Sequence, residues 1–279
     1  MTEKTAILFC VGRELLEGHV LDRNAHFMAT HLSQIGVRVR TIQVLDDVES
    51  EIVAAIRHAA SLRPNYILMT GGMGPGPQDL TRAAAAKAVD LPLVADDRAR
   101  EFVTNSYRRW LAKGIVDNAE VGEDRIALTY VPKGATAFEN MSGTAPALAF
   151  QKDGVKVFLL PGQPEELRQL FTEHVKPAIA AESTRDFRDQ IHIDFPGGDE
   201  SLLPRLLGDL GRRHPQVQSR SRSLSGERGT GIRITLTVEG TNREELTRAL
   251  DDAAADLRAR LGLEFSDTRT GRSIAANGE

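Results

Sequence analysis

The first half of the chain alternates short apolar runs with stretches of helical periodicity. Residues 6–11 have the sequence AILFCV, which is typical of a strand buried on both faces. Residues 22–35 place apolar side chains at helical spacing and end at Gly36, a common helix stop. Further strands are expected at 37–45, 66–70, 145–150 and 155–160, and further helices at 49–62, 80–89, 96–112 and 165–181. This order predicts an α/β fold with a mostly parallel sheet.

The second part of the chain has a different composition and rhythm. All lysines lie at or before Lys176, and the remaining chain uses only arginine, which indicates a boundary near residue 180. After it, strands are expected at 190–195, 216–221 and 232–238, and helices at 199–210 and 242–261. This β-α-β-β-α order predicts a small α/β sandwich. The expected domains are therefore 1–180 and 186–265, followed by a flexible polar tail, 266–279.

Charge and composition exclude several classes of protein. The formal net charge of −4 argues against bulk attraction to nucleic acid or anionic lipid. No stretch approaches the ~18–20 apolar residues of a membrane span, and residues 1–5 lack a secretory signal pattern. The single cysteine, Cys10, is expected to be buried and unreactive. A cytoplasmic location is the default. Residues 226–229 have the form of a KH-type GxxG loop, but they join two expected strands, so nucleic-acid binding is disfavoured.

A glycine-rich turn, Thr70–Thr81 (TGGMGPGPQDLT), carries the strongest functional signal. It follows an apolar strand and precedes a helix, at the sheet edge where α/β proteins bind ligands. Glycines let the backbone approach a phosphate closely, and free amides at a helix start favour negative charge. The turn lacks the Gly-Lys-Ser/Thr of a Walker loop. A ligand-free tight turn is the alternative.

Carboxylates are expected on the same edge of the sheet. Asp79 follows the glycine turn, Asp46 and Asp47 follow the strand 37–45, and Glu14 follows the first strand. If these groups converge beside a phosphate, they would suit Mg²⁺ or Mn²⁺, which prefer oxygen ligands. Two structural alternatives stay open: Asp79 as a helix N-cap, and a solvated acidic rim.

Several spaced motifs together resemble a known family. They are Gly12–Gly18 (GRELLEG), Asn24, Asp46, Thr70–Thr81, Asn140–Pro146 (NMSGTAP) and Leu160–Leu167 (LPGQPEEL). This set resembles the molybdopterin-binding (MoCF) domain, and more closely its version in the CinA-like (competence/damage-inducible) family. The resemblance implies a three-layer α/β/α domain, often oligomeric, followed by the small domain found in CinA-like proteins. A C-terminal deamidase domain, frequent in that family, is not expected here.

The resemblance also implies the site. Asp79 and Glu14 would be catalytic residues that hold the metal, with Asp46 as a third catalytic carboxylate. The implied ligand-binding residues are Gly12, Arg13, Thr70, Gly71, Gly72, Gly74, Thr81, Asn140, Ser142, Gly143, Thr144, Pro161, Gly162 and Glu166. The ligand would be a small nucleotide or pterin, with Mg²⁺, Mn²⁺ or Co²⁺ as the metal.

Three departures from the family pattern leave the activity open. Arg13 replaces a usual threonine, Gly76 another threonine, and Gln78 the first of two aspartates. Arg13 could compensate by pairing with a phosphate. The leading hypothesis is a metal-dependent pyrophosphatase acting on ADP-ribose-like or FAD-like dinucleotides. The alternative is a molybdopterin or nucleotide binder without turnover. It arises because Gln78 stands where the family has an aspartate, and the missing carboxylate is a potential metal ligand.

Overall fold

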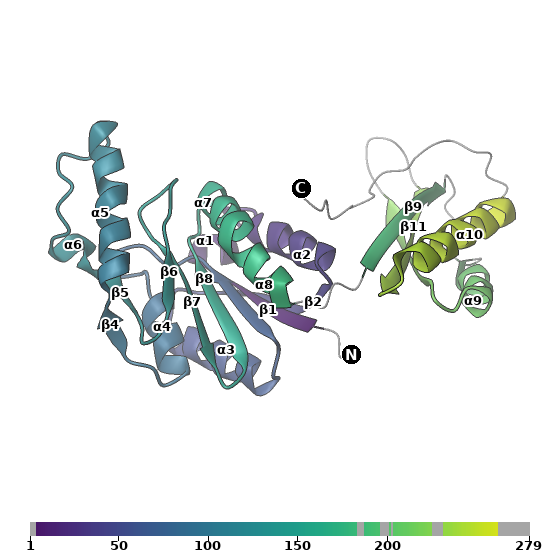
Figure 1. Ribbon diagram of the computed structural model, residues 1–279, viewed down its shortest axis with the longest axis horizontal. Helices are drawn as coiled ribbons and strands as arrows, with labels where there is room; N and C mark the ends of the chain where they lie inside the picture. Colours follow the sequence, from purple (N-terminus) through teal and green to yellow (C-terminus); the bar gives the residue numbers. More distant parts are fainter. Residues whose placement is uncertain (1–3, 183–186, 196–200, 202, 225–230, 262–279) are drawn as a thin grey trace. The chain divides into compact units, whose positions relative to one another are not determined.

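The computed structural model describes residues 4–182, 187–195, 201, 203–224 and 231–261 (Figure 1). The chain divides into two compact units. The main part of the second unit begins at residue 184. The expected tail 266–279 and the GxxG segment 226–229 lie outside the described residues.

The first unit is built on a six-stranded sheet in the order β2-β1-β3-β8-β7-β6. Strands β1, β2, β3 and β8 are parallel, whereas at one edge β7 runs antiparallel to β8 and β6 runs antiparallel to β7. The predicted mostly parallel α/β fold is therefore confirmed. The strands are β1 (Lys4–Val11), β2 (Val37–Leu45), β3 (Tyr66–Thr70), β6 (Thr136–Phe138), β7 (Ala147–Lys152) and β8 (Val155–Leu160).

Helices cover both faces of this sheet, as Figure 1 shows. Helices α3 (Glu49–Ser61) and α4 (Thr81–Ala88) lie on one face, and α2 (Asn24–Gln34), α7 (Pro164–Leu170) and α8 (Lys176–Glu182) on the other. The side chains of β1 alternate between the two cores: Phe9 packs with the α3 and α4 side, whereas Leu8 and Cys10 are buried but do not belong to that cluster. The expected buried state of Cys10 is confirmed.

Some elements were not predicted from the sequence. They are α1 (Arg13–Leu16), α6 (Glu123–Ile126), the 3₁₀ turn η1 (Ala127–Thr129), β6, and the two-stranded ribbon of β4 (Leu93–Ala95) and β5 (Tyr130–Pro132) that flanks α5 (Asp97–Ala112). Each is very short or lacks clear periodicity. The helix expected over 165–181 contains a π-helical turn, η2 (Phe171–Val175), between α7 and α8.

The second unit is a three-stranded antiparallel sheet in the order β10-β11-β9, with two helices. The elements are β9 (Phe187–Phe195), α9 (Leu203–Arg213), β10 (Gln218–Leu224), β11 (Gly231–Gly240) and α10 (Arg243–Leu261). Alternate residues of β11, from Ile232 to Val238, pack with the apolar stripes of both helices. The order is the β-α-β-β-α predicted.

Candidate functional site

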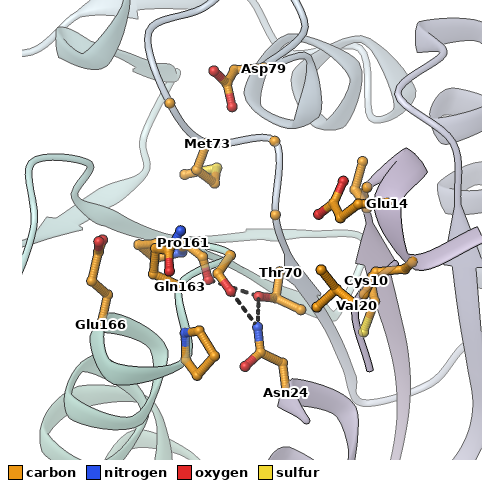
Figure 2. A pocket seen from close by; sticks show the side chains of 18 of the residues that line it. Cys10, Glu14, Val20, Asn24, Thr70, Met73, Asp79, Pro161, Gln163 and Glu166 are labelled. Carbon is orange, nitrogen blue, oxygen red and sulfur yellow. Dashed lines mark hydrogen bonds between the residues drawn. The ribbon is translucent and has the colours of Figure 1, made fainter. Parts of the chain in front are cut away.

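A pocket of about 550 Å³ lies at the carboxyl ends of β1, β3 and β8. Figure 2 shows side chains that line it, among them Glu14, Asp79 and Glu166. The lining comes from the segments after β1, β2, β3 and β8, together with Thr144 and Ala145. The volume lies within the range of small-molecule pockets, ~300–1,000 Å³. This position is where open α/β sheets bind ligands.

The glycine turn forms one wall, and its first two glycines, Gly71 and Gly72, have backbone conformations that a side chain would strain. Gly71 has φ +95°, and a Cβ there would collide with the carbonyl oxygen of Val11. Gly72 has φ +62°, a region that side chains rarely occupy. The hydroxyl of Thr81 donates to Gly71 O at 2.8 Å, and its amide donates to Gly72 O at 3.1 Å. The turn is thus fixed from the start of α4.

A buried arginine, which the sequence analysis did not single out, holds the rest of the turn. Arg82 is 4% exposed and donates to Met73 O and Gly74 O, both at 2.7 Å. Burial lowers the pKa of Arg82 to about 10, although nearby Asp79 acts in the opposite direction. The guanidinium donates one hydrogen bond to each of these two backbone carbonyls, and this pair of bonds orients the peptide groups of the turn.

The side chain of Asp79 bonds to the glycine turn and does not cap helix α4. Its Oδ2 accepts a 2.9 Å hydrogen bond from the amide of Gly76. The N-cap position of α4 belongs to Leu80, whose side chain makes no capping bond. The N-cap alternative for Asp79 is therefore wrong, and the carboxylate lines the pocket instead.

Carboxylates in this region lie directly over glycines. A Cβ on Gly74 would come within 2.5 Å of Asp79 Oδ2, and one on Gly12 within 2.5 Å of Glu14 Oε1. A Cβ on Gly143 would likewise collide with the carboxylate of Glu166. The space above each glycine is thus occupied by an acidic side chain at or beside the pocket.

Thr70 ties three elements together below the pocket, as the dashed lines in Figure 2 show. Its hydroxyl donates to Pro161 O at 2.8 Å and accepts from Asn24 Nδ2 at 3.2 Å. The same Nδ2 donates to Gly162 O at 2.7 Å. Thr70 is 2% exposed. These bonds fix the ends of β3 and β8 against the start of α2.

Asn140 organises the opposite wall. Its Oδ1 accepts from the amides of Ser142 and Gly143, and its Nδ2 donates to Ala145 O at 2.9 Å and to Glu166 Oε2 at 2.6 Å. Burial raises the pKa of Glu166 above its ordinary value, and the bond from Asn140 opposes that shift in part. Asn140 is a loop-positioning residue with its side chain fully engaged in the protein.

The structure brings together eleven of the predicted site residues and leaves six outside the pocket lining. Those in the lining are Gly12, Glu14, Thr70, Gly71, Gly72, Gly74, Asp79, Thr144, Pro161, Gly162 and Glu166. Those outside it are Arg13, Asp46, Thr81, Asn140, Ser142 and Gly143. Thr81 and Asn140 act through the backbone that they hold, and Ser142 donates its hydroxyl to Gln169.

Arg13 and Asp46 pair with one another outside the pocket. The guanidinium donates to both carboxylate oxygens, at 3.0 and 3.2 Å, and this raises the pKa of Arg13 and lowers that of Asp46. The neighbouring Asp47 lines the pocket instead and accepts from the backbone amide of Arg13. Pairing of Arg13 with a phosphate stays a prediction, and it would require the guanidinium to leave Asp46.

Sequence reasoning also missed part of the lining. Asp22 and Arg23, just before α2, were given no role, and Gln163 and Val20 complete the walls. An acidic residue before a helix looks like an ordinary cap, and Asp22 does accept from the amides of Asn24 and Ala25. Within the described residues, no group of three or more His, Cys, Asp or Glu side chains is arranged to hold a metal ion. Glu14, Asp47 and Asp79, which follow three strand ends, do line the same pocket, but they do not form a ready-made metal-binding cluster.

Comparison with known proteins finds matches over the part of the chain that contains these motifs. The sequence profile of a family described as "Probable molybdopterin binding domain" matches residues 7–181. The chain belongs to this family. It is a CinA-like member, as its similarity to a CinA-like protein and to a CinA structure shows.

Similar proteins align with most of the length of this CinA-like chain. A Pyrococcus abyssi protein, PYRAB15930, is 30% identical over 246 residues, which cover 88% of this chain and 94% of that protein. A CinA-like protein of Myxococcus xanthus is 29% identical over 262 residues, or 92% of this chain and 59% of that longer protein. The crystal structure of CinA from Thermoplasma acidophilum matches 63% of this chain and 98% of its own at 30% identity, with a TM-score of 0.57.

No helix in the described part of the CinA-like chain has the length and apolar character that a membrane crossing requires.

Proposed function

We propose that the pocket hydrolyses the pyrophosphate bond of a dinucleotide of the ADP-ribose or FAD class, with a divalent metal ion. One observation carries this proposal. The same pocket of about 550 Å³ is lined by the glycine turn, which suits phosphates, and by the carboxylates of Glu14 and Asp79. Oxygen ligands beside a phosphate site are the donor set that Mg²⁺ and Mn²⁺ prefer. Molybdopterin, also a phosphorylated ligand, fits the same description.

The charge of the pocket supports the need for a cation. Its lining includes one arginine, Arg23, and five carboxylates: Glu14, Asp22, Asp47, Asp79 and Glu166. The formal balance is one positive against five negative charges, or −4. A diphosphate alone would be repelled by this lining. A bound divalent metal would offset that repulsion, neutralise charge on the phosphates and lower the pKa of an attacking water.

The residues present fit a metal held partly by the ligand. Mg²⁺ is commonly bound by one or two carboxylates plus substrate phosphates, so a three-residue cluster is not required. We assign this role to Asp79 and Glu14. Backbone amides of Gly72 and Gly74 would approach the diphosphate, whereas the amide of Gly71 already donates to Leu160 O at 3.1 Å; Thr144 would add a hydroxyl. Hydrolysis joins the water oxygen to one phosphorus, breaks the bridging P–O bond and releases two phosphate monoesters.

One observation favours binding without turnover as a second candidate. Gln78 lines the pocket where the family pattern has an aspartate, so a potential metal ligand is neutral here. In this case the chain would hold a nucleotide or molybdopterin and leave it intact. Gln78→Asp tests the difference directly, because restoring the carboxylate should raise turnover only if the remaining machinery is competent.

The deciding experiment is release of AMP from ADP-ribose and FAD, with Mg²⁺, Mn²⁺, Co²⁺ or EDTA. Asp79→Asn should abolish metal-dependent product, whereas the control Asp153→Asn should not, because Asp153 lies in the exposed turn between β7 and β8. Asp153 has φ +48°, which asparagine tolerates. Full turnover by Asp79→Asn would overturn the assignment. Ligand binding without product would establish the second candidate.

Cytoplasmic location and homo-oligomerisation stay predictions. The oligomeric state is measured by sedimentation of the purified chain, with a single species of monomer mass contradicting the expectation.

A further inference from the structure

The second unit presents an ordered polar face on its sheet. Register places outward side chains in three cross-strand rows, each running from β9 through β11 to β10. The rows are Gln190–Thr237–Gln218, His192–Thr235–Arg220 and Asp194–Arg233–Arg222. The apolar residues between them, such as Ile193, Ile234 and Leu236, face the helices. All nine side chains in the rows are polar.

This face is hollowed. A cavity of about 360 Å³ is lined by Gln190, His192, Gln218, Arg220, Ser221, Arg222, Thr235 and Thr237. Both helices of the unit, α9 and α10, pack with the opposite, apolar face of the sheet. The polar face is therefore not covered by a helix of its own unit within the described residues.

Most polar groups in the rows already have partners. Arg233 donates to both carboxylate oxygens of Asp194, at 2.6 and 2.7 Å. A ring nitrogen of His192 lies 3.0 Å from Thr235 Oγ1, and Gln190 donates to Thr237 Oγ1 at 3.2 Å. In the described part of the chain, Arg220 and Arg222 have no hydrogen-bonded or ion-paired partner. Two guanidinium groups thus lie two residues apart on one strand face, and Arg222 adds to the lowering of the pKa of Asp194 that Arg233 mainly causes.

We propose that this hollow binds the phosphate group of a small molecule, with Arg220 and Arg222 as its main contacts. Guanidinium forks match phosphate oxygens and bind them in pairs. Side chains two residues apart on a strand point to the same side, so both forks reach one anion. The amide of Gln218 and the second ring nitrogen of His192 lie in the same lining and add neutral hydrogen-bonding groups.

Size and chemistry favour a small phosphorylated ligand over a nucleic acid. Among the described residues, no Phe, Tyr or Trp lines the hollow, whereas single-stranded nucleic acid is usually held by bases stacked on aromatic rings. The face is basic only locally: three arginines and one aspartate in the rows give +2, while the whole chain carries −4. A confined hollow with two cations suits one phosphate or diphosphate.

The test measures binding of inorganic pyrophosphate to the full chain by calorimetry, in EDTA so that no divalent metal assists the first pocket. Arg220→Gln/Arg222→Gln should weaken binding by about tenfold or more, since two charge-assisted contacts are lost. The matched control is Arg205→Gln/Arg248→Gln, which removes the same charge from exposed positions on α9 and α10. It should stay within about twofold of the unmodified chain.

A second readout is the ring-proton resonance of His192, assigned with His192→Gln. It should shift on pyrophosphate addition in the unmodified chain and in the control, but not in the Arg220/Arg222 variant. Equal affinity of both double variants, or no binding by the unmodified chain, would overturn the site. Tighter, salt-sensitive binding of a single-stranded oligonucleotide through the same two arginines would overturn the small-molecule assignment. In a separate assay with Mg²⁺, both double variants should keep the metal-dependent hydrolysis of the unmodified chain, so failure of this site and failure of the proposed function are distinguishable.

Discussion

The side-chain amide of Asn140 donates a 2.6 Å hydrogen bond to Glu166, which joins the loop after β6 to the helix that follows β8. The other bonds of Asn140 hold the amides of Ser142 and Gly143. One asparagine thereby sets the position of a pocket carboxylate and of the loop beside it. The pocket is assembled by such links between segments far apart in the sequence.

Glu166 should make folding stability depend on pH. Burial raises its folded-state pKa above the ordinary 4.5, so the protonated form is favoured in the folded protein. Its contribution to stability is present below about 4.5 and is lost as pH rises through the raised folded-state pKa. Glu166→Gln should therefore gain stability relative to the unmodified chain between about pH 4 and about pH 7.

Urea unfolding at both pH values measures this difference. Glu165→Gln, exposed in the same helical turn, is the matched control and should show no comparable gain. A stability difference for Glu166→Gln that is the same at both pH values would contradict the prediction.

Alanine substitutions at two glycines of the turn should separate folding from binding. Gly71→Ala places a Cβ against the carbonyl oxygen of Val11 at φ +95°, and neither backbone can move away cheaply. We expect a loss of roughly 2–5 kcal/mol in the free energy of unfolding. At Gly74 the three atoms nearest the new Cβ all belong to the carboxylate of Asp79, which can move aside by giving up its bond from the amide of Gly76, so the loss should be about 1–2 kcal/mol.

Gly74→Ala should instead weaken metal-dependent ligand binding, because the displaced carboxylate is the proposed metal ligand. Urea unfolding and ligand titration on both variants check the contrast. If Gly71→Ala proved as stable as the unmodified chain, the close approach of the two backbones would be disproved.

Removing the guanidinium of Arg82 should destabilise the first unit. Arg82→Met leaves the carbonyls of Met73 and Gly74 without their buried donors, at a cost of about 2–4 kcal/mol. Arg82→Lys should recover only part of this, because an ammonium cannot reproduce the two-carbonyl fork. Arg100→Met, exposed on α5, is the control and should be nearly neutral. Denaturant midpoints for the three variants provide the measurement.

Arg13→Ala should leave ligand affinity nearly unchanged, within about twofold. The guanidinium is paired with Asp46 and lies outside the pocket lining. Titration of the variant and the unmodified chain with the same dinucleotide and metal measures the effect. A tenfold loss would mean that Arg13 leaves Asp46 and contacts the phosphate when ligand binds.

The sequence by itself determined the strand order along the chain, the mostly parallel sheet and the place of the glycine turn. Hydrophobic periodicity and glycine position are local properties, so residues 6–11, 66–70 and 155–160 were recognisable as strands without their partners. The family motifs located the same sheet edge because their residues follow strand ends.

Only the tertiary structure decided which side chains line the pocket. Arg13 pairs with Asp46, Asp22 and Asp47 line the pocket, and Asn140 bonds to its own loop and to Glu166. The rows that place Arg220 beside His192 likewise exist only through strand register. The physical reason is that hydrogen bonds and ion pairs between distant segments depend on sheet order and register, which no local pattern encodes.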